Sequence, residues 1–304
     1  MLHAHQTPAQ KRETLRHSLE QGDLLRFPGA FSPLVALMIE RLGFEGIYLS
    51  GAVLAADLGL PDIGLTTLSE VSARSHTIAR VTNLPAIVDI DTGFGEPLNT
   101  ARTIQVLEDL GLSGCHLEDQ RNPKRCGHLD YKQLVSPDEM VQKIRAAAEA
   151  RRDPNFLLIA RTDARASEGL DGAIERAQHY LDSGADAIFP EALMNRKEFE
   201  HFRKAIDAPL IANMTEFGKS ELLDIKTLRN LGYNIVLYPV TPLRLAMHAV
   251  ESGLRLVAEH GTQRELLDVM QSRSELYNLL DYESYTRFDR DLFNFSLPRD
   301  EQAG

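Results

Sequence analysis

Short apolar runs alternate along the chain with amphipathic segments of helical length. The runs are apolar on both faces and rich in Ile, Leu and Val, which is typical of parallel strands covered by helices on both sides. The pattern predicts eight strands, over residues 25–28, 46–50, 86–91, 114–118, 156–161, 187–191, 209–213 and 235–239.

The segments between these strands carry the signals that start and stop helices. Ser32 and a following proline open one helix, which is predicted to end at Gly43. Residues 136–139, Ser-Pro-Asp-Glu, form a capping box ahead of a second helix. An apolar stripe with helical period runs from residue 170 to residue 181, and Thr241 opens a helix predicted to run through Val250.

Eight strand–helix repeats over roughly 250 residues predict an α/β fold, a closed (β/α)₈ barrel of the TIM type. An open, doubly wound sheet would call for a glycine-rich loop after an early strand, and Gly93-Phe94-Gly95 lacks the third glycine of that motif. We therefore expect a single barrel domain over residues 1–304, with a helical extension over 1–23 and a helical tail from about 263 to 304.

Aromatic residues are concentrated in that tail. Aromatic side chains at such density are rarely left in water, so the tail is expected to pack as helices on the barrel or on a partner subunit. The residues concerned are Tyr277, Tyr282, Tyr285, Phe288, Phe293 and Phe295.

Charge and composition narrow the classes of partner. The chain has 33 Lys and Arg against 44 Asp and Glu, a formal net charge of −11, which argues against nucleic acid or an anionic membrane as its main partner. Two cysteines, a polar N-terminus and the absence of any apolar run long enough to cross a membrane predict a soluble, cytoplasmic protein. A local cluster of arginines could still bind a small acid.

Polar residues stand at nearly every predicted strand end. In a barrel, the carboxyl ends of the strands converge on one mouth, so these residues are expected to form a metal and anion site. They are Ser50, Asp89, Asp91, Glu118, Asp119, Arg161, Asp163, Glu191, Asn213 and Tyr238.

The acidic residues among them suggest a metal site. Asp89 and Asp91 are two residues apart on a strand, so both side chains should point to the same side and favour a hard divalent cation. Glu118, at the end of the next strand, is placed to share the ion or its waters, and Asp62 could add another oxygen.

Residues 124–128, Lys-Arg-Cys-Gly-His, are the most unusual stretch. Lys124, Arg125 and His128 surround the Cys126 thiol in sequence, and such neighbours are expected to lower its pKa and hold it as a thiolate or a ready acid. Gly127 would allow the backbone to approach an anionic ligand closely.

Two other uses of the cysteines are disfavoured. A zinc site from Cys115, His116, Cys126 and His128 would need two adjacent strand residues to face the same way. A protease-like pair of Cys126 and His128 would need nucleophile and base two residues apart in one loop. We interpret Cys115 as a small core residue.

Several side chains are candidates for binding carboxylates. Arg161, Arg244 and Arg273 could each clamp a carboxylate with paired hydrogen bonds. Asn213 and Thr215 follow the seventh strand and could add neutral donors.

Residues 88–95, 118–120, 124–128 and 160–164 resemble the isocitrate lyase and phosphoenolpyruvate mutase superfamily, and the Lys-Arg-Cys-Gly-His stretch resembles its carbon–carbon lyase branch. Residues 189–192, 213–218 and 270–277 are similar to the 2-methylisocitrate lyase family in particular. The resemblance runs from about Leu24 to about Phe293, nearly the whole chain.

The resemblance implies a barrel whose last helix is swapped with a neighbour, in a homotetramer built as a dimer of dimers. It implies cleavage of (2S,3R)-2-methylisocitrate to pyruvate and succinate, in the methylcitrate cycle of propionate catabolism, with Mg²⁺ or Mn²⁺. Asp89 and Asp91 would hold the metal, with Asp62 and Glu118 acting through its waters. The tricarboxylate substrate would lie against Ser50, Gly51, Ala52, Cys126, Gly127, Arg161, Glu191, Asn213, Thr215, Arg244 and Arg273.

Such a cleavage needs a base, an electrophile and an acid. Cys126 is suited to protonate the succinate carbanion, tuned by Lys124, Arg125 and His128, and Tyr48 is the candidate base by position. Ala52 stands where the family usually has glycine and could narrow the substrate range. The alternatives are related enzymes that hydrolyse oxaloacetate or cleave 2,3-dimethylmalate; a non-enzymatic barrel would be expected to have lost the thiol or a metal carboxylate.

Overall fold

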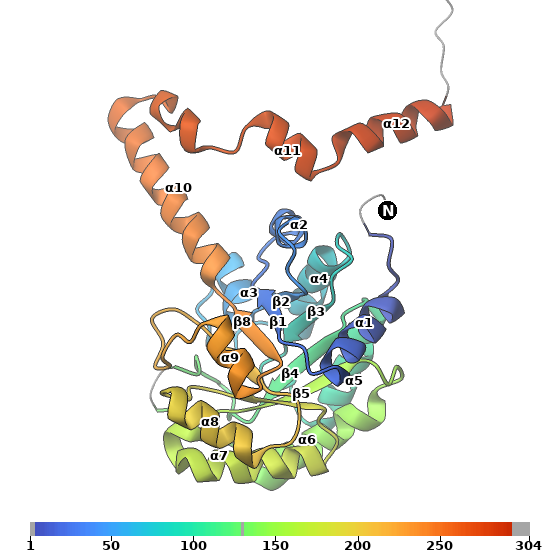
Figure 1. Ribbon diagram of the computed structural model, residues 1–304, viewed down its shortest axis with the longest axis vertical. Helices are drawn as coiled ribbons and strands as arrows, with labels where there is room; N and C mark the ends of the chain where they lie inside the picture. The colour runs from blue at the N-terminus through green and yellow to red at the C-terminus, as the bar shows by residue number, and fades with distance from the viewer. Residues whose placement is uncertain (1–3, 129–130, 294–304) are drawn as a thin grey trace, which may run out of the picture.

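Within residues 4–128 and 131–293, which the computed structural model describes, eight parallel strands close into a barrel (Figure 1). Strands β2 to β6 form one hydrogen-bonded run in chain order, and β1, β8 and β7 form another. Single parallel bridges, Gly29 to Tyr48 and Ile188 to Leu210, join the two runs on either side. The predicted (β/α)₈ barrel is therefore confirmed. Its strands are β1 Leu25–Pro28, β2 Ile47–Leu49, β3 Ala86–Asp89, β4 Gly114–Glu118, β5 Leu157–Thr162, β6 Ala187–Pro190, β7 Ile211–Asn213 and β8 Ile235–Tyr238.

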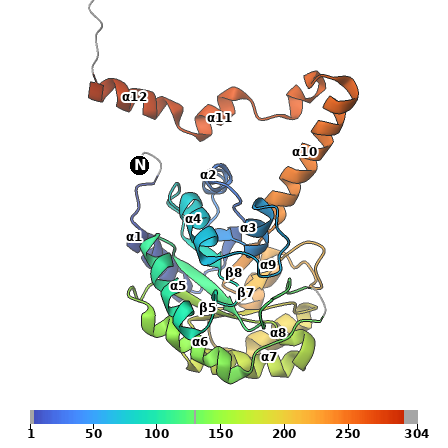
Figure 2. The same cartoon turned by 180° about the vertical axis from the view of Figure 1, so that it is seen from behind.

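Helices cover the outside of the barrel (Figure 2). Ser32 and Ser136 cap α2 and α6 as their sequence signals predict, each accepting a hydrogen bond from a backbone N–H of the first turn. The described helices around the barrel are α1 Pro8–Glu20, α2 Pro33–Arg41, α3 Gly51–Asp57, α4 Leu68–Ala79, α5 Pro97–Asp109, α6 Pro137–Ala150, α7 Arg165–Asp182, α8 Arg196–Ala205 and α9 Ile225–Leu231.

The barrel interior is a packed apolar core that supports the mouth from below. Alternate residues of the strands point inward and bury large side chains such as Phe27, Tyr48 and Phe189. Leu15 and Leu19 of α1 join this cluster from the end where the strands begin. This helix thus closes the barrel at the end where the strands begin, and the opposite end, at the carboxyl ends of the strands, stays open.

The C-terminal helices extend away from the barrel (Figure 1). They are α10 Thr241–His260, the 3₁₀ helix η1 Arg264–Val269, α11 Arg273–Leu279 and α12 Tyr282–Phe293. The helix predicted from Thr241 through Val250 is confirmed, and it continues beyond that range to His260, where the left-handed Gly261 caps it.

This tail has little contact with its own barrel. The helix α10 buries none of its residues, and α11 lies near α2. The aromatic residues of the tail remain well exposed, Tyr282 at 57% and Phe288 at 52%. The Phe293 side chain and Phe295 lie outside the described residues. None of the helices in the described ranges is long and apolar enough to cross a membrane.

Candidate active site

The inward-facing side chains at the ends of β3 to β7 form a polar layer at the barrel mouth. Strand alternation places them above the apolar core, and Asp89, Glu118, Arg161 and Glu191 are all at least nine-tenths buried. A cavity of about 60 Å³ lies among them. Of the residues predicted for the site, it is lined by Tyr48, Ser50, Ala52, Asp62, Asp89, Lys124, Cys126, Gly127, His128, Arg161, Glu191, Asn213 and Thr215.

Arg161 is the cationic centre of this layer. Its Nε lies 3.0 Å from Asp163 Oδ2, 3.3 Å from Glu118 Oε2 and 3.9 Å from Glu191 Oε2. Its guanidinium also stacks 5.1 Å from the ring centre of Phe189. With carboxylates on three sides and an aromatic ring on another, the guanidinium is fixed in orientation.

Asp89 and Asp91 meet by a route that differs from the predicted one. The strand ends at Asp89, and Asp91 adopts a left-handed backbone, φ 46°, so strand alternation does not place it. The turn is held by the Asp91 N–H, which donates to Asp89 Oδ1 at 2.9 Å. A Cβ at Gly51 would lie 2.8 Å from Asp89 Oδ2 and 3.2 Å from Asp91 Oδ1. Gly51 therefore leaves room for both carboxylates.

The Lys124 ammonium sits among these acids. Its Nζ lies 2.7 Å from Asp91 Oδ1 and also pairs with Asp62. Burial alone would lower the pKa of Lys124, but nearby carboxylates, Glu118 foremost, raise it above its usual value. Burial and the charge of Asp89 raise the pKa of Asp91 to about 6. This lysine thus balances the negative charge of the site and stays protonated.

The acids fit the requirements of a hard divalent cation. In the described part of the chain, no three His, Cys, Asp or Glu side chains stand close enough to hold a metal ion unaided. Mg²⁺, however, is commonly bound by one or two carboxylates together with waters and substrate oxygens. Both carboxylate oxygens of Glu118 are buried and accept no hydrogen bond, although Oε2 forms an ion pair with Arg161 Nε at 3.3 Å, so both have room to accept hydrogen bonds from metal-bound water.

The surroundings of Cys126 differ from those predicted. Lys124 is engaged with Asp62 and Asp91. Arg125 is exposed, and its backbone N–H and C=O both bond to the side-chain amide of Gln120. Burial raises the pKa of the Cys126 thiol, and the nearby carboxylates raise it further. The prediction of a lowered pKa is therefore wrong. The Lys124 and His128 side chains are engaged with carboxylates, and the hydrogen bond from the His128 backbone does not offset the effect of burial, so the thiol holds its proton at neutral pH.

His128 and Gly127 hold this segment against the barrel. His128 Nδ1 accepts a hydrogen bond of 2.9 Å from the Lys219 N–H, and its Nε2 lies 2.7 Å from Glu191 Oε1. A Cβ at Gly127 would lie 2.4 Å from Arg161 Nη2 and 2.5 Å from Glu191 Cγ. The backbone beside Cys126 thus contacts the polar layer directly, which only glycine allows.

Tyr48 lies one layer below the mouth, beside a residue that sequence analysis did not assign to the site. The Tyr48 hydroxyl is 2.7 Å from Nε2 of His116, which in turn is 3.6 Å from Asp89 Oδ1. Burial raises the pKa of Tyr48 well above its ordinary value and lowers that of His116 to about 4. Both groups are neutral near pH 7. Strand alternation could have identified His116, since it faces the same way as Glu118.

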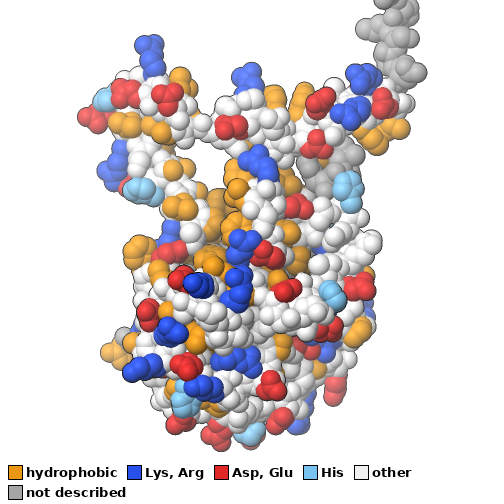
Figure 3. Space-filling view, viewed as in Figure 1, with side chains coloured by type: hydrophobic (Ala, Val, Ile, Leu, Met, Phe, Trp, Pro, Cys, Tyr) orange, Lys and Arg blue, Asp and Glu red, His pale blue; other side chains and the backbone are white. Residues whose placement is uncertain are grey.

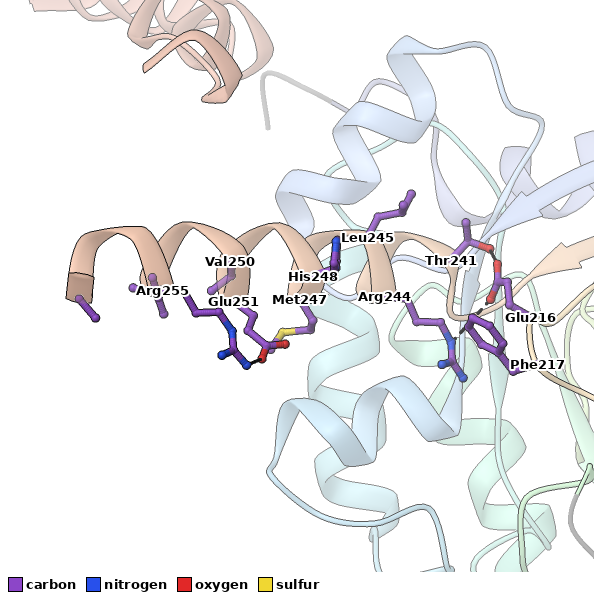
Figure 4. Close-up of a pocket in the computed structure, with 12 residues that line it drawn as sticks. Glu216, Phe217, Thr241, Arg244, Leu245, Met247, His248, Val250, Glu251 and Arg255 are labelled. Carbon is purple, nitrogen blue, oxygen red and sulfur yellow. Dashed lines mark hydrogen bonds and ion pairs between the residues drawn. The ribbon is translucent and has the colours of Figure 1, made fainter. Parts of the chain in front are cut away.

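Two predicted arginines do not reach the cavity within one chain. Arg244 on α10 is half exposed, lies 3.7 Å from Glu216 Oε2 and stacks on Phe217 at 5.1 Å, as Figure 4 shows. Arg273 is exposed at the start of α11, on the projecting tail. Cys115 is fully buried in the apolar shell outside the barrel, so a zinc site with His116 is not formed.

Comparison with known proteins decides the family. The phosphoenolpyruvate phosphomutase profile matches residues 15–258. A probable 2-methylisocitrate lyase of Corynebacterium glutamicum is 58% identical over 95% of this chain and 94% of its own. The 2-methylisocitrate lyase of Aeropyrum pernix is 49% identical over 91% of this chain and 90% of its own length. The chain belongs to the 2-methylisocitrate lyase family.

Solved structures of more distant superfamily members share the fold. Oxaloacetate acetylhydrolase bound to 3,3-difluorooxalacetate superposes with a TM-score of 0.90 at 32% identity, covering 96% of this chain and 100% of that one. Phosphonopyruvate hydrolase with oxalate and Mg²⁺ has a TM-score of 0.85 at 31% identity, covering 94% and 99%. Membership of the 2-methylisocitrate lyase family confirms the resemblance drawn from the sequence and identifies the chain as a carbon–carbon lyase.

Proposed function

We propose that the protein cleaves the C2–C3 bond of (2S,3R)-2-methylisocitrate to give pyruvate and succinate, in the cytoplasmic breakdown of propionate. The position and protonation of Cys126 support this activity independently of the family. A protonated thiol, Cys126, is held by the buried Gly127 backbone at the mouth of a barrel, in a cavity that carboxylates, Arg161, Lys124 and His128 also line. An acid that is neutral at pH 7 is what protonation of a carbanion requires.

A substrate with three carboxylates would be held by groups around the cavity. Arg161 supplies the cation in a fixed orientation, and Asn213 and Thr215 supply neutral donors from the end of β7. Ser50 and Ala52 line the same cavity at the end of β2. Ala52 adds a methyl group there, which would favour a compact acid at that side.

Asp89 and Asp91 would hold Mg²⁺ or Mn²⁺, with Asp62 and Glu118 acting through its waters. When bound, the cation would polarise the 2-hydroxyl and its carboxylate and offset the charge that forms on oxygen. The phosphonopyruvate hydrolase structure with Mg²⁺ supports the choice of metal.

Tyr48 and Cys126, which both line the cavity, would carry out the proton transfers. The C2 hydroxyl loses its proton, the C2–C3 bond breaks, a C2 carbonyl forms, and the electron pair remains on C3 of the departing succinate. Tyr48 would receive the hydroxyl proton only while passing its own toward His116, 2.7 Å away, because the phenol is protonated. Cys126 then gives its thiol proton to C3, with Lys124 and His128 holding the segment in place.

The same proposal includes a homotetramer, a dimer of dimers with the last helix swapped. A groove of about 1050 Å³ runs along α10, and Leu245 and Leu254 beside it are 67% and 62% exposed. Apolar side chains, orange in Figure 3, also lie along the other tail helices. Exposed apolar side chains on α10, α11 and α12 are suited to contact with a second copy of the chain.

A side-by-side assay tests the activity. The 2-oxo acid product is followed with 2-methylisocitrate, isocitrate and 2,3-dimethylmalate, and the oxalate and acetate formed by hydrolysis are followed with oxaloacetate, each with Mg²⁺. We expect 2-methylisocitrate to have the highest kcat/KM. A higher kcat/KM for oxaloacetate or 2,3-dimethylmalate would replace this proposal with the corresponding activity.

A further inference from the structure

Lys132 contacts the site although no sequence signal marks it. Its side chain is 3% exposed, and its ammonium donates a hydrogen bond to the Gly127 carbonyl. The same ammonium lies 2.8 Å from Asp163 Oδ1. One buried cation therefore joins the backbone next to Cys126 to a carboxylate of the barrel.

Asp163 connects Lys132 to Arg161 in the polar layer. Its side chain is fully buried, and its Oδ2 accepts a 3.0 Å hydrogen bond from Arg161 Nε. Its own backbone N–H donates to Asp119 Oδ1 at 2.9 Å, which anchors Asp163 to another fully buried carboxylate. Lys132 and Arg161 thus share one immobile carboxylate, so the position of Lys132 is coupled to that of Arg161.

We infer that Lys132 is a positioning residue, which holds the Gly127 backbone in the barrel mouth so that the Cys126 thiol faces the substrate and Arg161 stays oriented by Asp163. The catalytic use of the thiol in this inference rests on the proposed function. The position of the thiol rests only on the contacts of Lys132. Without the ammonium, the Gly127 carbonyl loses its charged donor, and a charge-assisted hydrogen bond of this kind shifts an equilibrium by about tenfold or more.

The test uses the full-length protein and the two cysteines. Cys115 is fully buried and Cys126 is partly exposed, so the rate of iodoacetamide labelling at Cys126, located by mass spectrometry, reports how the segment is held. Lys132→Met removes the donor, Lys132→Arg restores one, and Lys197→Met on the exposed face of α8 is the matched control. Labelling is followed across pH, so that a change in plateau rate is separated from a change in thiol pKa.

In Lys132→Met we expect Cys126 to label about tenfold faster at plateau, with kcat lower by a similar factor and KM less changed. Lys132→Arg should recover most of both, and Lys197→Met should match the wild type. Wild-type labelling in Lys132→Met overturns the inference. Equal labelling of Cys126 in the Met and Arg variants also overturns it. So does labelling of the buried Cys115 in Lys132→Met, because the faster reaction of Cys126 would then come from unfolding.

The labelling arm needs no substrate. If the wild type does not cleave 2-methylisocitrate but Lys132→Met labels faster at Cys126, the proposed function fails and the positioning role stands. If cleavage is observed and labelling is unchanged, the positioning role fails alone.

Discussion

Replacing Gly127 by alanine should damage catalysis far more than folding. The added Cβ would lie 2.4 Å from Arg161 Nη2 and 2.5 Å from Glu191 Cγ, where the closest real contacts are about 3.0 Å, so the atoms must separate by about 0.6 Å. Arg161 cannot yield, because Asp163 and Glu118 hold it at 3.0 and 3.3 Å. Glu191 is held by His128 at 2.7 Å. The segment that carries Cys126 must therefore move outward.

A displacement of about 1 Å at a reacting group can cost about 10²-fold in rate, so we expect kcat to fall by between about 10-fold and 10²-fold. Overpacking costs about 1–3 kcal/mol in a closed core. Because a segment at the mouth can relax, we expect the free energy of unfolding to fall by about 1 kcal/mol. The assay compares kcat for 2-methylisocitrate with the free energy of unfolding in urea.

Gly22→Ala is the control for stability alone. Gly22 follows α1 at the far end of the barrel, has φ 75°, and a Cβ there would meet nothing within 4 Å. A left-handed alanine costs about 1–2 kcal/mol, so this variant should lose stability and keep its kcat. Wild-type kcat in Gly127→Ala would refute the reasoning, because it would mean that the Gly127 backbone does not contact Arg161 and Glu191 in the working enzyme.

Four further outcomes are expected. Cys126→Ser replaces the acid with a much weaker one and should lower kcat by at least about 10²-fold in the pyruvate assay, whereas Cys115→Ser should mainly lose stability; equal losses of turnover would contradict the assignment of the acid. Chelation should abolish turnover until Mg²⁺ is restored, and Asp89→Asn should lower kcat by at least about 10²-fold; full activity in exhaustively chelated enzyme would exclude the metal. Because burial raises the pKa of Cys126 and only the thiolate is alkylated, its iodoacetamide labelling should rise with pH to a midpoint above that of free cysteine, and a midpoint at or below that of free cysteine would contradict this environment. Deleting the residues after Asp281 should shift a tetramer to smaller species in light scattering, and a truncated chain that remains tetrameric would argue against the role given to the tail.

The barrel was predictable because its strands are buried on both faces. Each observed strand falls within or next to a predicted apolar run, and the caps at Ser32 and Ser136 act locally, so a short sequence window contains the whole signal. The helix from Thr241 extends beyond the predicted range, past Val250, to a cap at Gly261, which is itself a helix stop signal in the sequence. The family resemblance from Leu24 onward was likewise correct, because its motifs are contiguous segments.

The site was predictable as a set of residues and less so as a set of contacts. Strand alternation explains why Asp89, Glu118 and Glu191 converge, but the left-handed backbone at Asp91 is a property of a turn that alternation does not describe. In the segment around Cys126, adjacency in sequence suggested cationic neighbours, whereas the backbone directs Lys124 to Asp62 and Asp91.

Long-range partners were the part that the sequence did not indicate. Lys132 reaches Asp163 across 31 positions of chain, and no local pattern marks such a pair. Arg244 lies in the first turn of α10, beside Glu216 and Phe217 of its own chain, and Arg273 lies farther out on the projecting tail. Neither lines the cavity. Their place in the substrate site stays a prediction.

Cleavage of 2-methylisocitrate in deuterium oxide, with the products identified by NMR and mass spectrometry, tests the central claim most directly. We expect equal amounts of pyruvate and succinate, with one deuterium on each succinate in a single stereochemical sense, because an exchanged Cys126 thiol delivers it from one side of C3. No succinate from 2-methylisocitrate would contradict the proposed reaction, and deuterium distributed equally between both faces of that carbon would contradict a positioned acid.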